Sequence, residues 1–322
     1  MKPLVDIAVV SYNHENFIRQ AMDSILAQRT DFDFRIIVGD DGSTDGTQAI
    51  LRDYERCHPG RVETILYRKN EGILTPKRLG LQVIHRCTSK YTAMLDGDDY
   101  WTDQTKLQTQ IDILESDPTI AVCFHNCDEY FEDNSQPSFR FCRPDQPRTS
   151  SVEDLLEKNY IPSSSIVWRT EARGEIPNWF TTVRPGDWIL NILHAQRGKI
   201  VYVDKTMSCH RIHSAGVNQD VEGILRDMVA TYEHVDAQLE RRYSKRIESK
   251  IAQVYRQLAA GPIRRRGPGA VARFFLDEMS RRPGAVRPIL SAVLGGGQTF
   301  VRTRIERHAR RVIARFGGTT QS

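Results

Sequence analysis

The feature that most constrains the fold is a repeated alternation of short apolar runs with amphipathic segments. Residues 4–10 (LVDIAVV) are rich in β-branched side chains, and in residues 15–28 the apolar side chains recur at helical spacing. The same order returns at residues 32–40 and from residue 47 onward. This alternation predicts an α/β fold with a mainly parallel, doubly wound sheet and a functional site at the carboxyl ends of its strands.

Later segments extend this pattern into the middle of the chain. Apolar runs predict further strands at residues 62–67, 91–95, 120–126, 163–169 and 199–204. Helical spacing predicts helices at residues 106–115, 152–157, 188–195, 221–258 (one long helix or two shorter ones), 270–281 and 299–316. Residues 132–149 are polar and contain proline, so we expect a loop there, and residues 261–269 form a Gly/Pro/Arg hinge.

Charge divides the chain into two parts, for which we expect domains at residues 1–220 and 221–322. Residues 221–322 carry 20 basic and 9 acidic side chains, whereas the first 220 residues carry 25 basic and 32 acidic ones. A basic tail of this kind either contacts an anionic surface or is simply solvated. We expect no nucleic-acid partner, and we regard an anionic membrane or a second copy of the chain as candidate partners of the tail.

Composition argues against a membrane-spanning or secreted chain. No run of about 18 uncharged apolar residues is present, and Asp6 interrupts the first apolar run. The six cysteines are scattered without a CxxC pair. Reduced thiols and a cytoplasmic location, at most peripheral to the inner face of the membrane, are therefore expected.

Acidic residues are crowded where the fourth predicted strand ends, in the sequence LDGDDYW (95–101). Asp96, Asp98 and Asp99 would repel one another, and a divalent cation such as Mg²⁺ or Mn²⁺ would relieve that repulsion through its preference for oxygen ligands. Such a cation can also neutralise a departing diphosphate. The alternative is a solvated acidic turn, because Asp and Gly are common turn residues.

A second acidic group, Asp40 and Asp41, follows the strand at residues 32–40 in the sequence GDDGSTDGT. A carboxylate there can accept a hydrogen bond from a base N–H, and the imide of uracil provides one. A helix-capping loop is the alternative, but capping does not account for both aspartates. The chain has no Walker A lysine motif and no GxGxxG, which disfavours nucleotide binding by those routes.

Together these segments resemble the family 2 glycosyltransferases with the GT-A fold, and most closely the bacterial members that act on cell-surface sugars. The matching segments are VVSYNHENFIRQAMDSILAQ (9–28), IIVGDDGSTDGT (36–47), NEG (70–72), LDGDDYWTDQTKLQTQIDILE (95–115), SSSIVWR (163–169), PGDW (185–188) and RIHSAGV (211–217). They span about the first 218 residues in order. The resemblance implies a Rossmann-like GT-A domain followed by a C-terminal helical extension that the motifs do not cover.

The resemblance implies roles for particular residues. Contacts to the nucleotide-sugar fall on Val10, Ser11, Asn13, Asp41, Asp96 and Asp98. Of these, Asp41 matches the carboxylate that reads uracil. Asp99 matches the metal-ligating aspartate of the DxD motif, and His213 matches a histidine that holds the metal or the diphosphate. His210 stands where the family often has tyrosine, which leaves the choice between the two histidines to position alone, and position favours His213.

Asp187, in PGDW, matches the catalytic base of the family. An inverting transfer needs one displacement and a base that takes the proton of the acceptor hydroxyl, and an aspartate of ordinary pKa is ionised at neutral pH. A retaining mechanism would need a second carboxylate as nucleophile by analogy with hydrolases, and no second motif supplies one. The alternative for Asp187 is an N-cap for the helix expected from Trp188.

From these features we expect an inverting glycosyltransferase that uses Mn²⁺ or Mg²⁺. Its donor is a nucleotide-sugar, UDP-linked, and its acceptor is a glycan or a lipid-linked hydroxyl in cell-surface polysaccharide synthesis. One alternative is a non-catalytic nucleotide-sugar-binding subunit that acts as a scaffold through its helical tail. Another is a nucleotidyltransferase, which would need a Gly-rich triphosphate loop that the first strand lacks.

Overall fold

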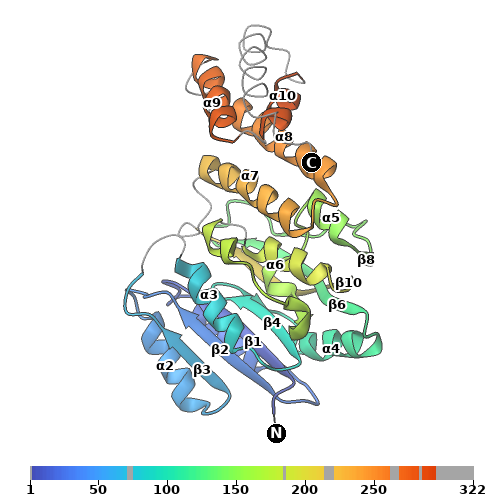
Figure 1. Cartoon of the computed structure of the whole chain (residues 1–322). Helices are drawn as coiled ribbons and strands as arrows, with labels where there is room; N and C mark the ends of the chain where they lie inside the picture. Colours follow the sequence, from blue (N-terminus) through green and yellow to red (C-terminus); the bar gives the residue numbers. More distant parts are fainter. Residues whose placement is uncertain are drawn as a thin grey trace. The chain divides into compact units, whose positions relative to one another are not determined.

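The structure is a computed structural model that describes residues 2–70, 75–183, 186–213, 221–261, 268–282 and 285–294. The chain divides into two compact units, of which the first includes most of residues 1–216 and the second most of residues 217–322 (Figure 1). The predicted helix at residues 299–316 and the RRR sequence at residues 264–266 lie outside the described residues.

The first unit is built on one mixed sheet with the strand order β3-β2-β1-β4-β9-β6-β10-β5. Its parallel half contains β3 (Val62–Leu66), β2 (Phe34–Asp40), β1 (Val5–Ser11) and β4 (Tyr91–Asp96). Its other half contains the parallel pair β6 (Ile120–Phe131) and β10 (Lys199–Ile212). Between the halves lies β9 (Val167–Arg169), which is antiparallel to both neighbours. The short strands β5 (Tyr100–Trp101), β7 (Phe139–Arg140) and β8 (Thr149–Ser150) pair at the margins.

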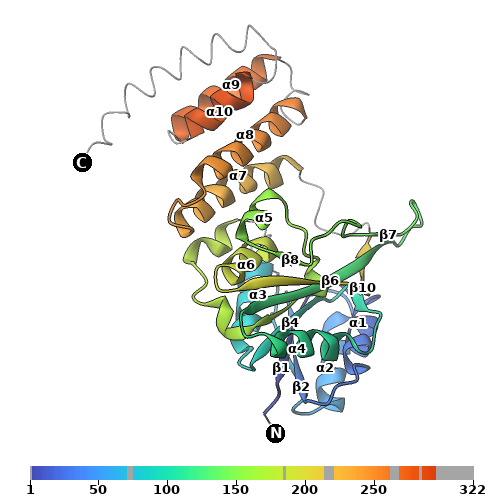
Figure 2. The same ribbon diagram turned by 90° about the vertical axis from the view of Figure 1, so that its right-hand side faces the viewer.

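Helices cover both faces of this sheet, as expected for strands linked by helical crossovers. The α-helices of the first unit are α1 (Ile18–Leu26), α2 (Thr47–Cys57), α3 (Thr75–Arg86), α4 (Lys106–Ser116), α5 (Val152–Glu157) and α6 (Gly186–Ala195). Figure 2 shows α1 and α2 on one face of the parallel half and α3 on the opposite face, which α6 also covers. Short 3₁₀ turns lie at Ser163–Ser165, Thr170–Arg173 and Asn178–Thr182.

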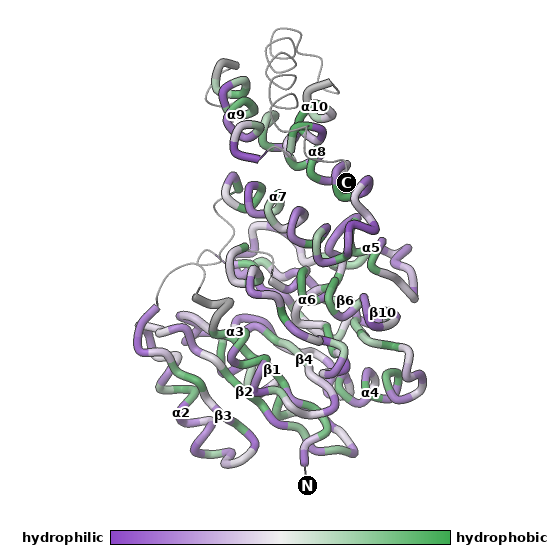
Figure 3. The backbone as a smooth tube through the Cα atoms, in the orientation of Figure 1, coloured by the Kyte–Doolittle hydropathy of each residue, from purple (hydrophilic) through white to green (hydrophobic). Residues whose placement is uncertain are grey.

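The sequence dictates this layering through burial on both sides of the central strands. Apolar residues of β1, β2 and β4 are almost fully buried against apolar residues of α1, α2 and α4. Figure 3 shows the corresponding difference in hydropathy between strands and helices. Hydrophobic residues run along the central strands, whereas they alternate with hydrophilic ones in the helices. Burial of this apolar surface is the main favourable term that fixes the positions of the strand ends.

The second unit contains α7 (Val221–Gln238), α8 (Ser244–Ala260), α9 (Pro268–Arg281) and α10 (Val286–Leu294). Glu278 lies buried in it and accepts hydrogen bonds from Arg226 Nη1 at 3.1 Å and Tyr255 Oη at 3.2 Å. Within the described part of the chain, no helix has both the length and the apolar character that crossing a bilayer requires.

The predicted fold class is confirmed, and several predicted elements need correction. Residues 163–165 form a 3₁₀ turn rather than part of a strand, in which Ser165 Oγ donates to Pro162 O at 2.7 Å and Ser164 Oγ lies 2.9 Å from Ser208 Oγ of β10. The long predicted loop at 132–149 contains β7 and the start of β8, both too short to carry a periodic pattern. β10 continues eight residues beyond the predicted end at residue 204. Residues 221–258, for which one long helix or two shorter ones were expected, form parts of two helices, α7 and α8.

Candidate active site

The site lies at the carboxyl ends of three strands, β1, β2 and β4. Backbone hydrogen bonds connect the loops that follow these strands. Gly97 N donates to Val10 O at 2.9 Å, and Asp41 N donates to Ser11 O at 3.0 Å. A Cβ atom at Gly97 would lie 2.9 Å from Ser11 Cβ, so only glycine permits the loop after β4 to approach β1 this closely. The ends of β1, β2 and β4 therefore form one continuous rim.

Asp40 holds the loop after β2 in place. Its carboxylate accepts hydrogen bonds from Ser11 Oγ at 3.0 Å, from the Ser43 N–H at 2.9 Å and from Gln48 Nε2 at 2.6 Å. A buried carboxylate with this many donors is satisfied within the protein. Asp40 is therefore a structural residue of the rim, which leaves Asp41 as the aspartate of this pair that can face a ligand.

Asp41 is buried at the edge of the same loop and accepts a hydrogen bond from Asn70 Nδ2 at 3.0 Å. Gly42, directly after it, has a φ of +71° and approaches the backbone of Lys69 and Asn70 so closely that a side chain would collide with it. This left-handed turn is accessible to glycine at little cost. It fixes the carboxylate of Asp41 between the loop after β2 and the segment after β3.

Asn13 links the first two loops of the rim. It has a left-handed backbone with a φ of 54°, which asparagine tolerates better than most residues. Its N–H donates to Ser43 Oγ at 2.8 Å, and its Oδ1 accepts from the Thr44 N–H at 2.9 Å. Val10, Ser11 and Asn13 thus shape the wall of the rim next to Asp41.

The three aspartates at the end of β4 and in the loop after it occupy three different environments. Asp96 Oδ2 accepts a hydrogen bond from Ser163 Oγ at 2.9 Å. Asp98 Oδ2 lies 3.1 Å from His213 Nε2 and 3.5 Å from His14 Nε2. Asp99 is buried, and its Oδ1 accepts the backbone N–H of Arg211 at 2.9 Å. The structure therefore brings Asp98 to His213 and directs Asp99 to the backbone of β10.

Burial and mutual repulsion raise the pKa of two of these carboxyl groups. Desolvation, followed by the charge of Asp98, raises the pKa of Asp96 to about 6. Desolvation, followed by the charges of Asp96 and Asp98, raises the pKa of Asp99 well above its usual range. Both effects disfavour the ionised form, and a bound cation would reverse them.

His14 is a residue of the site that our sequence reasoning missed. His14 Nε2, Asp98 Oδ2 and His213 Nε2 form a group whose ligand atoms lie within 4.8 Å of one another. Burial lowers the pKa of His14, which keeps its imidazole neutral and available as a ligand. In the sequence, His14 is separated from Asp98 by more than eighty residues, and only the pairing of β1 with β4 shows that they meet.

Asp187 lies in the first turn of α6 and is half-buried. Its Oδ2 accepts a hydrogen bond from Asn159 Nδ2 at 2.9 Å. Its charge also contributes to the raised pKa of Asp96, which places the two carboxyl groups in the same neighbourhood. His210, the other histidine considered, lies 3.6 Å from Glu129 and is not part of the His14–Asp98–His213 group.

A mainly parallel α/β sheet of this kind, flanked by helices and followed by C-terminal helices, is a GT-A-like fold. The family profile "Glycosyl transferase family 2" matches residues 6–171, and the chain belongs to this family.

Relatives extend this similarity beyond the family profile. An uncharacterized protein of Mycobacterium tuberculosis is 36% identical over 214 residues, which cover 66% of this chain and 60% of that protein. The chain thus spans about 60% of the length of the mycobacterial relatives it matches. The putative teichuronic acid biosynthesis glycosyltransferase TuaG of Bacillus subtilis is 28% identical over 190 residues, covering 58% of this chain and 71% of that one.

Solved structures with low sequence identity share the fold. S. aureus TarS 1–349 in complex with UDP-GlcNAc has a TM-score of 0.62 at 15% identity, covering 98% of this chain and 93% of that one. The mannosyltransferase PcManGT from Pyrobaculum calidifontis, in complex with GDP-Man and Mn²⁺, has a TM-score of 0.52 at 15% identity. This match covers 100% of the present chain and 89% of the mannosyltransferase chain.

Proposed function

We propose that the chain transfers a sugar from a UDP-sugar to a hydroxyl of a glycan or lipid-linked acceptor, with inversion at the anomeric carbon. The observation that carries this proposal is the convergence of Asp98, His14 and His213 on the rim that also presents Asp41. The TarS complex with UDP-GlcNAc and the teichuronic acid assignment of TuaG support a UDP-sugar and a cell-surface glycan. The competing donor is a GDP-sugar, because PcManGT was solved in complex with GDP-Man. A screen of UDP-sugars against GDP-sugars distinguishes the two donors.

On the donor side, Asp41 accepts the imide N–H of uracil, and the wall formed by Val10, Ser11 and Asn13 lies beside the base. A carboxylate oxygen only accepts hydrogen bonds, so it favours a base that presents an N–H at that position. Asp96, held by Ser163 at 2.9 Å, faces the ribose. The side chains of the rim are held by hydrogen bonds within the protein, which lowers the entropic cost of binding the nucleotide.

The residues present fit a divalent cation. His14 and His213 offer neutral nitrogen atoms and Asp98 offers a carboxylate oxygen, and this mixed donor set favours Mn²⁺ over Mg²⁺, which prefers oxygen ligands alone. When bound, the cation neutralises the charge of the departing diphosphate. In this assignment Asp98 takes the ligand role first expected for Asp99, and Asp99 positions Arg211 and thereby the segment that carries His213.

Asp187 acts as the base on the acceptor side. Asn159 holds one carboxylate oxygen of Asp187, which leaves the other for the acceptor hydroxyl. That oxygen takes the hydroxyl proton as the acceptor oxygen bonds to the anomeric carbon, and the bond between that carbon and the diphosphate oxygen breaks. A single displacement of this kind inverts the anomeric centre and needs no protein nucleophile.

Replacement of Asp187 tests the proposal. We expect Asp187→Asn to lower turnover of a UDP-sugar by roughly 10²–10⁴-fold, the usual contribution of a general base. Binding of UDP with Mn²⁺, measured by calorimetry, should be unchanged because Asp187 does not contact the nucleotide. Unchanged cellular function in this variant would instead support a non-catalytic scaffold. Failure of the wild-type chain to bind UDP or GDP with Mn²⁺ would overturn the donor assignment.

A further inference from the structure

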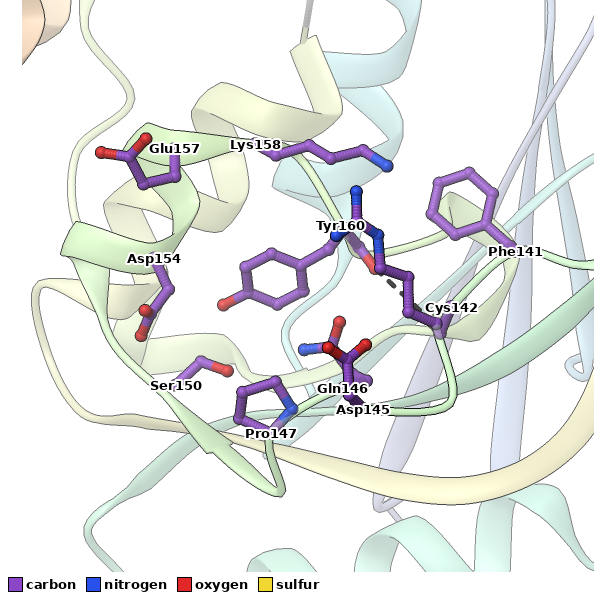
Figure 4. A pocket seen from close by; sticks show the side chains of 11 residues that line it. Phe141, Cys142, Asp145, Gln146, Pro147, Ser150, Asp154, Glu157, Lys158 and Tyr160 are labelled. Carbon is purple, nitrogen blue, oxygen red and sulfur yellow. Dashed lines mark hydrogen bonds between the residues drawn. The ribbon is translucent and has the colours of Figure 1, made fainter.

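A cavity of about 340 Å³ lies beside α5, outside the donor rim. Figure 4 shows it between α5 and the segment that runs from Phe141 to Ser150, with the ring of Tyr160 across its centre. A volume of this size falls at the lower end of the roughly 300–1,000 Å³ range of small-ligand sites. The established family assignment gives this cavity no role.

The lining combines an aromatic ring with side chains that hydrogen-bond in several directions. The side chain of Lys158 extends toward the ring of Phe141, and the Tyr160 hydroxyl faces Ser150 (Figure 4). Ser150 is 7% exposed. The two hydroxyl groups interact with each other, and within the described residues neither has a further hydrogen-bond partner of good geometry. Because each hydroxyl group can both donate and accept, the pair retains hydrogen-bonding capacity for a ligand or water in the cavity.

The charges around the cavity nearly cancel. The lining contains two basic side chains, Arg143 and Lys158, and three acidic ones, Asp145, Asp154 and Glu157. This balance gives no net attraction for a phosphate or a uronate. Aromatic rings and groups that both donate and accept hydrogen bonds instead match a neutral sugar, whose ring has apolar C–H faces and a rim of hydroxyl groups.

The cavity is linked to the proposed base through one residue. Lys158 has an extended backbone, with a φ of −163° and a ψ of 142°, so successive side chains point to opposite sides. Lys158 and Tyr160 line the cavity, and Asn159 between them donates its hydrogen bond to Asp187. A second hydrogen bond, which Trp188 Nε1 donates to Leu155 O at 2.8 Å, connects α6 to α5.

We propose that this cavity is an acceptor subsite for one neutral pyranose unit, remote from the unit that reacts. The proposal rests on the proposed glycosyltransferase function, since the subsite would hold a glycan acceptor while Asp187 deprotonates its terminal hydroxyl. The sugar ring would lie on Tyr160, and its hydroxyl groups would bond to Ser150, Asp145 and Arg143.

Saturation-transfer NMR on the full chain tests this proposal. The probes are the methyl pyranosides of glucose, galactose, mannose and N-acetylglucosamine, with methyl glucuronide as the charged comparison, all in excess UDP and Mn²⁺. We expect at least one neutral pyranoside to receive saturation. That signal should fall about fivefold or more in Arg143→Ala/Asp145→Ala, the loss expected for roughly 1 kcal/mol of hydrogen bonding.

The controls separate this proposal from the donor assignment. Arg143 and Asp145 are exposed, so the variant should fold, and Lys90→Ala alters an exposed ion pair with Glu115 instead and should leave the signal unchanged. No signal from any neutral pyranoside, an equal signal in the double variant, or a stronger signal from the glucuronide would overturn the proposal. UDP binding by calorimetry in the same samples reports the donor function independently, and we expect it to be unchanged in both variants.

Discussion

The donor rim and the cavity beside α5 differ in how their side chains are held. In the rim, Asp40 and Asn13 are fixed by several hydrogen bonds each, and Asp40, Asp41 and Asp99 are buried. Around the cavity, Arg143 and Lys158 are exposed, and in the described part of the chain no hydrogen bond or ion pair engages either charged group. In the proposed assignments, the nucleotide diphosphate would therefore bind a preorganised site, whereas the acceptor would contact side chains that can adapt.

The largest expected effect is on the rim. We expect Asp98→Asn to reduce turnover by about 10³-fold or more, because it removes the only anionic member of the His14–Asp98–His213 group. His14→Gln should weaken Mn²⁺ binding by roughly tenfold, about 1.4 kcal/mol, and narrow the preference for Mn²⁺ over Mg²⁺. UDP release from a UDP-sugar measures the turnover, and free Mn²⁺ measured by electron paramagnetic resonance, with and without UDP, measures the metal affinity.

Asp53→Asn is a matched control for this pair of variants. Asp53 is an exposed aspartate of α2 that pairs with Arg56 at 2.8 Å, and it is not part of the His14–Asp98–His213 group. We expect no change in Mn²⁺ affinity for it. If Asp98→Asn binds Mn²⁺ as the wild type does while Asp99→Asn does not, the ligand role returns to Asp99, as the DxD resemblance implies.

An intermediate effect is expected where the rim and the cavity are connected. Asn159→Ala removes the hydrogen bond that orients Asp187, so we expect kcat to fall roughly tenfold, the value of about 1.4 kcal/mol for a bond to a charged group. KM for the donor should be unchanged because Asn159 does not contact the nucleotide. Steady-state kinetics with a UDP-sugar gives both constants. An increase of donor KM with constant kcat would contradict a positioning role.

The sheet could be predicted from the sequence because its central strands are buried on both faces. Residues 4–10 and 32–40 are mostly apolar and rich in β-branched side chains, which leaves them few alternative structures, and helical segments alternate with them. The margins could not be predicted in the same way. β5, β7 and β8 have two residues each, and tertiary pairing alone determines them.

The same distinction between predictable and unpredictable parts applies to the residues of the site. Asp41, Asp96 and Asp98 follow strands that the sequence reveals, so their place on the rim could be expected. The distinction between Asp98 and Asp99 could not, because it depends on which carboxyl group faces β10. His14 and the cavity beside α5 depend on contacts between segments distant in the sequence, which periodicity and spacing do not encode.

The smallest expected effect concerns the framework beneath the rim rather than either site. Lys106 is fully buried at the start of α4, with its Nζ 3.9 Å from the centre of the Trp101 ring and without a hydrogen bond to any described residue. Burial lowers the pKa of this amine well below its usual range. We expect Lys106→Met to raise the free energy of unfolding at pH 7 by about 1–3 kcal/mol, the cost of burying an unpaired polar group.

The sign of the pH dependence makes this prediction specific. Because the lysine binds a proton in the unfolded chain but not in the folded one, wild-type stability rises with pH between the folded pKa and the ordinary value of about 10.4. The methionine variant lacks this slope, so its advantage should be larger at pH 6 than at pH 9. Urea unfolding followed by tryptophan fluorescence measures it, since Trp101, Trp168, Trp179 and Trp188 all lie in the first unit. Exposed Lys90→Met should change stability by no more than about 1 kcal/mol, and a destabilised Lys106→Met with the wild-type slope would mean that the buried amine is charged.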